Sequence, residues 1–179
     1  MSLKGIKVAM LVGPGYEDLE FWVPYMRLIE EEADITIVGI KEGETYTSKS
    51  GGLKVIAPVG ADSLKPEDFH AVLVPGGWAP DKLRRYPSVL KLVKGVYEKG
   101  GIVGSICHAG LVLISAGIVK GRKATGSLGI KDDLLNAGAI WVDEPAFREG
   151  NLVWGRVVED IPFYCRELVK ALNSLKERA

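Results

Sequence analysis

The sequence has no excess of charge and no long hydrophobic run. Its 23 basic residues balance 23 acidic residues, and no basic stripe follows the chain, which argues against nucleic acid or an anionic membrane as the main partner. No apolar run reaches the roughly 18 to 20 residues that a membrane span needs. The first residues contain no hydrophobic signal region followed by a cleavage site, so we expect a cytoplasmic protein that does not engage membranes.

Cysteine and histidine are both scarce. The chain has two cysteines, Cys107 and Cys165, and two histidines, His70 and His108. Two distant cysteines make no disulfide framework, which suits a reducing compartment. So few ligands, with no CxxC pair among them, argue against a zinc site. We therefore expect chemistry that uses neither a metal nor another cofactor.

The chain alternates between strand-like and helix-like segments. Its 179 residues fit one domain, residues 1–179, with a sizeable core. The expected strands lie at residues 6–12, 34–40, 69–74, 102–106, 140–142 and on both flanks of 149–151, with a hairpin at 45–56. The expected helices lie at residues 18–32, 88–99, 107–117, 132–137 and 160–175. This alternation predicts an α/β sandwich of three layers, a mostly parallel sheet with helices on both faces.

Apolar residues of the first expected helix fall on one face at helical spacing. They are Leu19, Trp22, Val23, Met26 and Ile29.

A glycine-led hydrophobic strand runs directly into a helix at residues 100–110, with Cys107 at the junction. A thiol there sits on a sharp turn at the positive end of a helix dipole, which favours the thiolate. Small residues on both sides permit the tight turn of a nucleophile elbow. A buried structural thiol is the ordinary alternative, but the junction favours a reactive Cys107.

The histidine next to this cysteine is a second candidate. Adjacent residues on a helix point in different directions, so His108 reaches the sulfur only if the elbow backbone is strained. The alternative is a histidine that lines the pocket. We expect His70, which precedes a buried strand, at the surface or in packing, and Cys165 in the packing of the last helix.

Loops at the carboxyl ends of parallel strands build the site in such a sheet. Three loops are candidates: residues 13–18, 75–81 and 106–110. In the first loop, Glu17 is either a carboxylate at a helix start or an acid that points into the cleft. Burial and a neighbouring thiolate would raise the pKa of such an acid, so that it could donate a hydrogen bond to sulfur.

The loop at residues 75–81 offers glycines beside an aromatic and an acid. Gly76 and Gly77 allow close backbone approach, and their amides could form an oxyanion hole with the amide of His108. We expect Trp78 to wall the pocket. Asp81 could orient a histidine, in this chain or in a partner subunit.

These residues together resemble a known family. The segments GYEDLE, AVLVPGGWAPD, GSICHAGLVLISAG, VKGRKATG and IKDDLLNAGAIW are similar, in order and spacing, to the PfpI family of intracellular proteases. That family belongs to a superfamily with the parkinsonism-linked deglycases and class I glutamine amidotransferase-like domains. The resemblance implies a flavodoxin-like sandwich with a nucleophile-elbow cysteine, assembled as a homo-oligomer, either a dimer or a hexamer.

The resemblance also implies roles for individual residues. The family's nucleophile falls on Cys107, its neighbouring histidine on His108 and its thiol-contacting acid on Glu17. Proteases of this family complete a triad across a subunit interface with an acid that falls on Asp81, where they usually carry the longer Glu. The Trp154-Gly155-Arg156 stretch stands where Ser-Ser-Arg is typical, so the substrate does not follow from the family.

Three functions are compatible with these residues. The leading hypothesis is a cysteine hydrolase of peptides or amides, in which Cys107 attacks a carbonyl and His108, aided by Asp81, moves the proton. The main alternative applies the same thiol to a small aldehyde such as methylglyoxal, with Glu17 as general acid and base, which is glyoxalase or deglycase chemistry. The third is a stress protein or chaperone without catalysis, in which Cys107 senses oxidants by forming a sulfinic acid.

Overall fold

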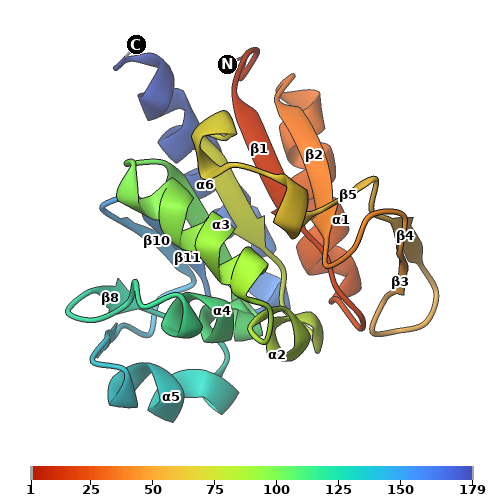
Figure 1. Cartoon of the computed structure of the whole chain (residues 1–179). Coiled ribbons are helices and arrows are strands. Elements are labelled where there is room, and N and C mark those ends of the chain that lie inside the picture. The colour runs from red at the N-terminus through yellow and green to blue at the C-terminus, as the bar shows by residue number, and fades with distance from the viewer. Residues whose placement is uncertain (1, 179) are drawn as a thin grey trace.

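The computed structural model describes residues 2–178 and is organised around one seven-stranded sheet (Figure 1). Its strands are β1 (Lys7–Leu11), β2 (Asp34–Gly39), β5 (Val59–Gly60), β6 (Ala71–Val74), β7 (Ile102–Ile106), β10 (Ala146–Glu149) and β11 (Leu152–Gly155). They are ordered β10-β11-β7-β6-β1-β2-β5. All neighbouring pairs are parallel except β10 and β11. The central strands are apolar and buried, as expected for parallel strands covered on both faces.

Helices cover both faces of this sheet. The longer ones are α1 (Asp18–Glu30), α3 (Pro87–Glu98) and α6 (Ile161–Lys176), and the shorter ones are α2 (Ala79–Leu83), α4 (Gly110–Ser115) and α5 (Lys131–Asn136). In Figure 1, α3 and α4 lie in front of the sheet and α6 lies behind it. Helix α1 packs against α6, and α3 packs against α4. The predicted flavodoxin-like three-layer α/β sandwich is confirmed.

Two small strand pairs and several 3₁₀ turns complete the described chain. β3 (Thr45–Thr47) pairs with β4 (Lys54–Ile56) as the predicted hairpin, and β8 (Lys123–Ala124) pairs with β9 (Ile140–Trp141). The 3₁₀ turns are η1 (Ala61–Ser63), η2 (Pro66–Asp68), η3 (Cys107–Ala109), η4 (Leu128–Ile130) and η5 (Val158–Asp160). Helix α2 was not predicted, because its single turn is too short to show a periodic pattern.

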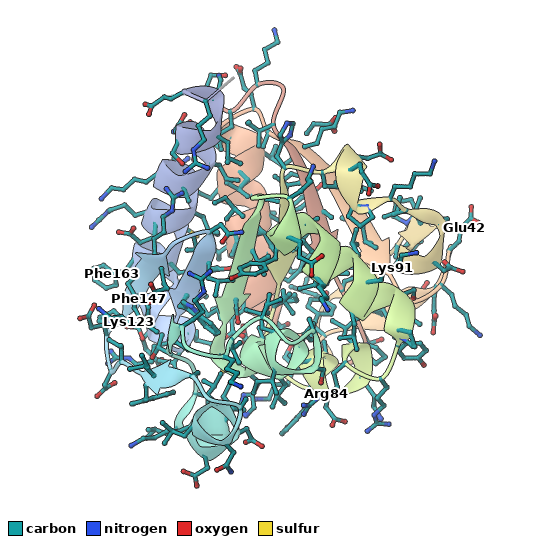
Figure 2. The ribbon with its side chains drawn as sticks, turned by 60° about the vertical axis from the view of Figure 1, so that its left-hand side comes forward. Glu42, Arg84, Lys91, Lys123, Phe147 and Phe163 are labelled. Atoms are coloured by element: carbon teal, nitrogen blue, oxygen red, sulfur yellow. The ribbon has the colours of Figure 1, made fainter. Side chains whose placement is uncertain are left out.

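Most of the apolar face that the sequence marks on α1 does not pack into the core. Trp22 packs against the core, but Leu19, Val23, Met26 and Ile29 are 40% to 61% exposed. The residues that α1 buries are instead Glu20, Phe21, Pro24 and Leu28. On the neighbouring helix α6, Phe163 is also exposed, at the outer edge of the molecule in Figure 2. Helix α1 therefore presents an exposed apolar surface on the outside of this chain. Among the described helices, none is long and apolar enough to cross a membrane.

The sheet order locates the site. β1 and β6 lie side by side at the centre, and the chain continues from β1 to β2 on one side and from β6 to β7 on the other. Such a switch in strand order opens a crevice at the carboxyl ends of the strands. The loops that follow β1, β6 and β7 meet there.

Candidate active site

Cys107 lies on a strained turn directly after β7. Its φ of 59° is in the left-handed region, where only one other non-glycine residue, Glu32, is found among the described residues. The residue begins the 3₁₀ turn η3, which continues into α4. The backbone of a non-glycine residue is strained in this conformation, and the strain persists only where the surrounding structure stabilises it. Such residues concentrate at functional sites. The sharp strand-to-helix turn expected of a nucleophile elbow is thus present.

The loops after β1 and β6 are joined by backbone hydrogen bonds. Tyr16 and Gly77 form an isolated antiparallel bridge. Beside it, the Glu17 N–H donates to the Gly76 carbonyl at 3.1 Å, and the Trp78 N–H donates to the Gly15 carbonyl at 2.9 Å. Gly77 has a φ of 79°, which favours glycine. The two loops therefore form one rigid wall of the crevice.

The acid beside the thiol is Glu20, in the first turn of α1. Its side chain is almost fully buried, with 1% exposed, and its Oε1 accepts a hydrogen bond from the Gly76 N–H at 3.0 Å. Its Oε2 is buried and has no hydrogen-bond partner among the described residues. A Cβ at Gly76 would collide with Glu20 Oε1 and crowd Cys107 Cβ, so the glycine lets the acid and the cysteine pack closely against this loop.

Burial controls the ionisation of Glu20. Loss of solvent, followed by the negative charge of Glu17, raises the pKa of Glu20 from 4.5 to about 8. The Gly76 N–H, the Cys107 thiol and the Lys49 ammonium oppose this increase. Glu20 is therefore mainly protonated at neutral pH and can donate a proton inside the crevice.

The prediction that Glu17 is the thiol-contacting acid is wrong. Glu17 is the N-cap of α1, and its Oε2 accepts a hydrogen bond from the Glu20 N–H at 2.8 Å. Its carboxylate is thus directed to the helix start, the alternative that the sequence had left open. Glu20 lies four and eight residues before Pro24 and Leu28, on the face that α1 buries, and the apolar spacing of the sequence does not mark that face.

The Cys107 thiol is partly buried, and the effect of burial on its pKa exceeds the effect of the helix start that follows it. Loss of solvent, followed by the charge of Glu20, raises the pKa of Cys107 from 9.0 to about 12. The backbone N–H of His108 and the charge of Lys49 act in the opposite direction. Glu20 raises the pKa of Cys107, whereas the Cys107 thiol lowers the pKa of Glu20, so the two groups titrate as a coupled pair. When Glu20 holds the proton, its charge no longer opposes formation of the thiolate.

His108 does reach the sulfur. Its Nδ1 lies 3.3 Å from Cys107 Sγ, a contact that neighbouring residues of a regular helix do not make. The left-handed turn at Cys107 makes the contact available. Burial and the charge of Lys49 lower the pKa of His108, so its imidazole is mainly neutral near pH 7 and can accept a proton from the thiol.

The two glycine amides have different roles. The Gly76 N–H is engaged by Glu20, so the predicted place of Gly76 in an oxyanion hole is wrong, and the residue positions the acid instead. The Gly77 N–H donates to no group among the residues that the structure describes. Gly77 thus retains a free donor beside the crevice, and the His108 amide lies at the sulfur.

Trp78 and Asp81 lie further from the thiol. Trp78 is 59% exposed, so it occupies the rim of the crevice rather than its wall. Asp81 lies in α2 and accepts a hydrogen bond from Arg85 Nη2 at 2.6 Å, with 56% of its side chain exposed. No hydrogen bond joins Asp81 to a histidine in the described part of this chain. Arg84, which follows α2 at the lower edge of Figure 2, donates to Ser115 Oγ.

The other histidine and cysteine lie apart from this site. The Lys7 N–H, at the opposite end of β1, donates a hydrogen bond to His70. Cys165 is buried in α6, as predicted, and both cysteines are free. Residues 2–178 contain no group of three His, Cys, Asp or Glu side chains placed to hold a metal ion.

Known proteins share this sequence and fold. The signature described as the DJ-1/PfpI family matches residues 6–171. The chain is 40% identical over 168 residues to Deglycase PH1704 of Pyrococcus horikoshii, and 36% identical over 168 residues to Deglycase PfpI of Pyrococcus furiosus. Each alignment covers 94% of this chain and 100% of the relative.

A solved structure from Anabaena variabilis also resembles the chain. That protein has two domains, one similar to DJ-1/ThiJ/PfpI proteins and one similar to ferritin. It superposes with a TM-score of 0.92 at 34% sequence identity and covers 94% of this chain, which spans 48% of that longer protein. The resemblance found in the sequence is thus confirmed, and the chain belongs to the DJ-1/PfpI family.

Proposed function

We propose that this protein is a cysteine-dependent deglycase or glyoxalase that acts on methylglyoxal or its adducts. Cys107 is the nucleophile and Glu20 is the general acid and base. The observation that carries the proposal is the buried Glu20 carboxyl beside the Cys107 thiol, mainly protonated at neutral pH. The names of the archaeal relatives support the same activity. This replaces the peptidase as the leading hypothesis.

The first step joins the thiol to the aldehyde. His108 accepts the thiol proton, and the Cys107 sulfur forms a bond to the aldehyde carbon. The carbonyl electron pair moves onto oxygen, which takes the proton of Glu20. The product is a hemithioacetal on Cys107, with Glu20 now a carboxylate beside it.

The second step exchanges protons along the two carbons of the substrate. The Glu20 carboxylate removes the hydrogen of the former aldehyde carbon as a proton and returns one to the neighbouring carbon. The hydroxyl proton of the hemithioacetal moves to the neighbouring carbonyl oxygen, and the result is a thioester of lactate. Water then cleaves the thioester, releasing lactate and the free thiol. The atoms balance as methylglyoxal plus water, with no external oxidant or reductant.

Room for a larger adduct lies next to the elbow. A cavity of about 420 Å³ is lined by Gly126, Leu128, Trp141 and Arg156, among others. Its Gly126 edge borders the elbow, because the next residue donates its N–H to the Cys107 carbonyl at 3.2 Å. A cavity of this size accommodates the side chain that carries an adduct, which supports adducts as well as free aldehydes as substrates.

A peptidase has less support from the same residues. Its triad needs an acid that orients His108, and the candidate Asp81 is paired with Arg85 on an exposed turn. In amide hydrolysis His108 would also donate the thiol proton to the amine leaving group, and no acid among the described residues of this chain hydrogen-bonds to His108 to orient it for that step.

A parallel assay of lactate formation and peptide hydrolysis tests the proposal. Wild-type protein is expected to form lactate from methylglyoxal, whereas Cys107→Ala and Glu20→Gln are expected to lose this activity. Glu17→Gln is the matched comparison: it removes a carboxylate from the same helix start and lowers the pKa of Glu20, but it leaves the Glu20 carboxyl in place and should retain lactate formation. Wild-type protein that cleaves peptides and forms no lactate would overturn the proposal.

We also propose that the chain forms a homo-oligomer in the cytoplasm. The exposed apolar face of α1, formed by Leu19, Val23, Met26 and Ile29, supports self-association, because a twofold axis would place two copies of one apolar patch together. The free state of both cysteines suits a reducing compartment. Light scattering of the purified protein measures the mass of the assembly.

A further inference from the structure

A lysine that the sequence did not single out lies over the site. Lys49 belongs to the loop between β3 and β4, and its N–H donates to the Tyr16 carbonyl at 2.7 Å. The next residue, Ser50, donates from its N–H and its Oγ to the Asp18 carboxylate, at 3.1 and 2.6 Å. These bonds tie the hairpin to the loop after β1, so the backbone of Lys49 has a fixed position beside the crevice.

The side chain of Lys49 extends from the hairpin to the glycine loop. Its Nζ lies 4.9 Å from the centroid of the Trp78 ring, a cation–π contact. No ion pair joins Lys49 to a carboxylate among residues 2–178. The ammonium is therefore held at the rim of the crevice, with its charge available to a ligand.

The charge of Lys49 acts on every titrating group at the centre of the site. It lowers the pKa of Glu20, Cys107 and His108 alike. Each of these three interactions favours negative charge in the crevice, which agrees with the position of the ammonium over the rim.

We propose that Lys49, held against Trp78, forms a binding site for an anionic group of the ligand that reacts with Cys107. The preferred ligands are small carbonyl compounds that carry a carboxylate next to the reacting carbon, of which glyoxylate is the simplest. The site also suits a carboxylate product. This inference rests on the proposed function only in taking Cys107 as the nucleophile.

Two alkylating reagents that differ in charge measure the electrostatic potential at the thiol. Iodoacetate and iodoacetamide react identically: sulfur forms a bond to carbon and iodide leaves. They differ in that iodoacetate is an anion and iodoacetamide is neutral. The ratio of their rates at Cys107, followed by mass spectrometry of the peptide, cancels any change in the fraction of thiolate.

Removal of the ammonium is expected to change this ratio. In Lys49→Gln the iodoacetate-to-iodoacetamide ratio should fall by about three- to tenfold, as Coulomb's law gives for one exposed charge a few ångströms away. Lys49→Arg should retain most of the ratio. Lys54→Gln is the matched control, because Lys54 is an exposed lysine in β4 of the same hairpin.

Protection by glyoxylate tests the ligand class directly. Glyoxylate adds to the thiol as a hemithioacetal, and it should slow alkylation by iodoacetamide several-fold more in wild-type protein than in Lys49→Gln. Glyoxal, which carries no charge, should protect the two proteins equally.

The outcomes separate this inference from the proposed function. An equal reagent ratio in wild-type protein and Lys49→Gln overturns the anion site, whatever the activity. A lowered ratio in a protein that forms no lactate supports the anion site and contradicts the deglycase. A Cys107 that reacts with neither reagent overturns both.

Discussion

The substitution Glu20→Gln separates the charge of the buried acid from its shape. Gln keeps the length of the side chain and an oxygen that can accept from the Gly76 N–H, as Glu20 does at 3.0 Å. It removes the ionisable proton. Any difference between the two proteins that depends on pH therefore reports the ionisation of Glu20.

The structure gives the sign and the size of that difference. The carboxyl ionises near pH 4.5 in the unfolded chain, and burial moves its pKa to about 8 in the folded protein. Between these values the folded protein holds a proton that the unfolded chain has lost, so its stability falls as pH rises, by about 1.4 kcal/mol per pH unit. From pH 5 to pH 7.5, Glu20→Gln should gain about 3 kcal/mol in free energy of unfolding relative to wild-type protein.

Urea unfolding followed by circular dichroism at the two pH values measures this gain. Contributions from His108 are present in both proteins and cancel in the difference. Glu67→Gln, at an exposed position, is the control for the loss of one carboxylate. If Glu20→Gln and wild-type protein differ by the same free energy at pH 5 and pH 7.5, Glu20 is not a buried acid with a raised pKa, and the general-acid role fails with it.

Three further substitutions test other parts of the structure. Gly76→Ala should abolish lactate formation and lower the free energy of unfolding by about 1 to 3 kcal/mol, because the added Cβ collides with Glu20 Oε1; a fully active variant would refute the close packing. Asp81→Asn should leave lactate formation within about twofold, because Asp81 forms an exposed ion pair with Arg85. A tenfold loss would favour a triad completed by a partner subunit. Met26→Lys should reduce the mass seen by light scattering, since it places a charge on the apolar face of α1; an unchanged mass would exclude this face as the interface.

The fold was predictable because its strands and turns are marked locally. β1, β6 and β7 are mostly apolar segments, each followed within two residues by a glycine or by the cysteine, and each leads into a loop that the sequence already marked as part of the site. The short elements β5 and β8 lack such a pattern, because two residues carry no periodicity.

The acid of the site was not predictable from hydrophobic pattern. On α1 the apolar residues at helical spacing, Leu19, Val23 and Met26, point away from the core. The apolar pattern therefore does not mark the face that α1 buries, on which Glu20 lies. Lys49 was missed for a different reason: its position depends on how a hairpin packs on a distant loop, which no local pattern records.

The strained turn at Cys107 brings the side chain of the next residue, His108, into contact with the sulfur. A left-handed residue other than glycine costs about 1 to 2 kcal/mol, and glycine would adopt the φ of 59° at Cys107 without that cost. Yet the conformation turns the chain so that His108 Nδ1 lies 3.3 Å from Sγ. Glu20 interacts with the same thiol from α1 and is held in place by the Gly76 N–H. One thiol is thus contacted by a neutral imidazole and by a protonated carboxyl, the pair of groups that the proposed addition to an aldehyde requires.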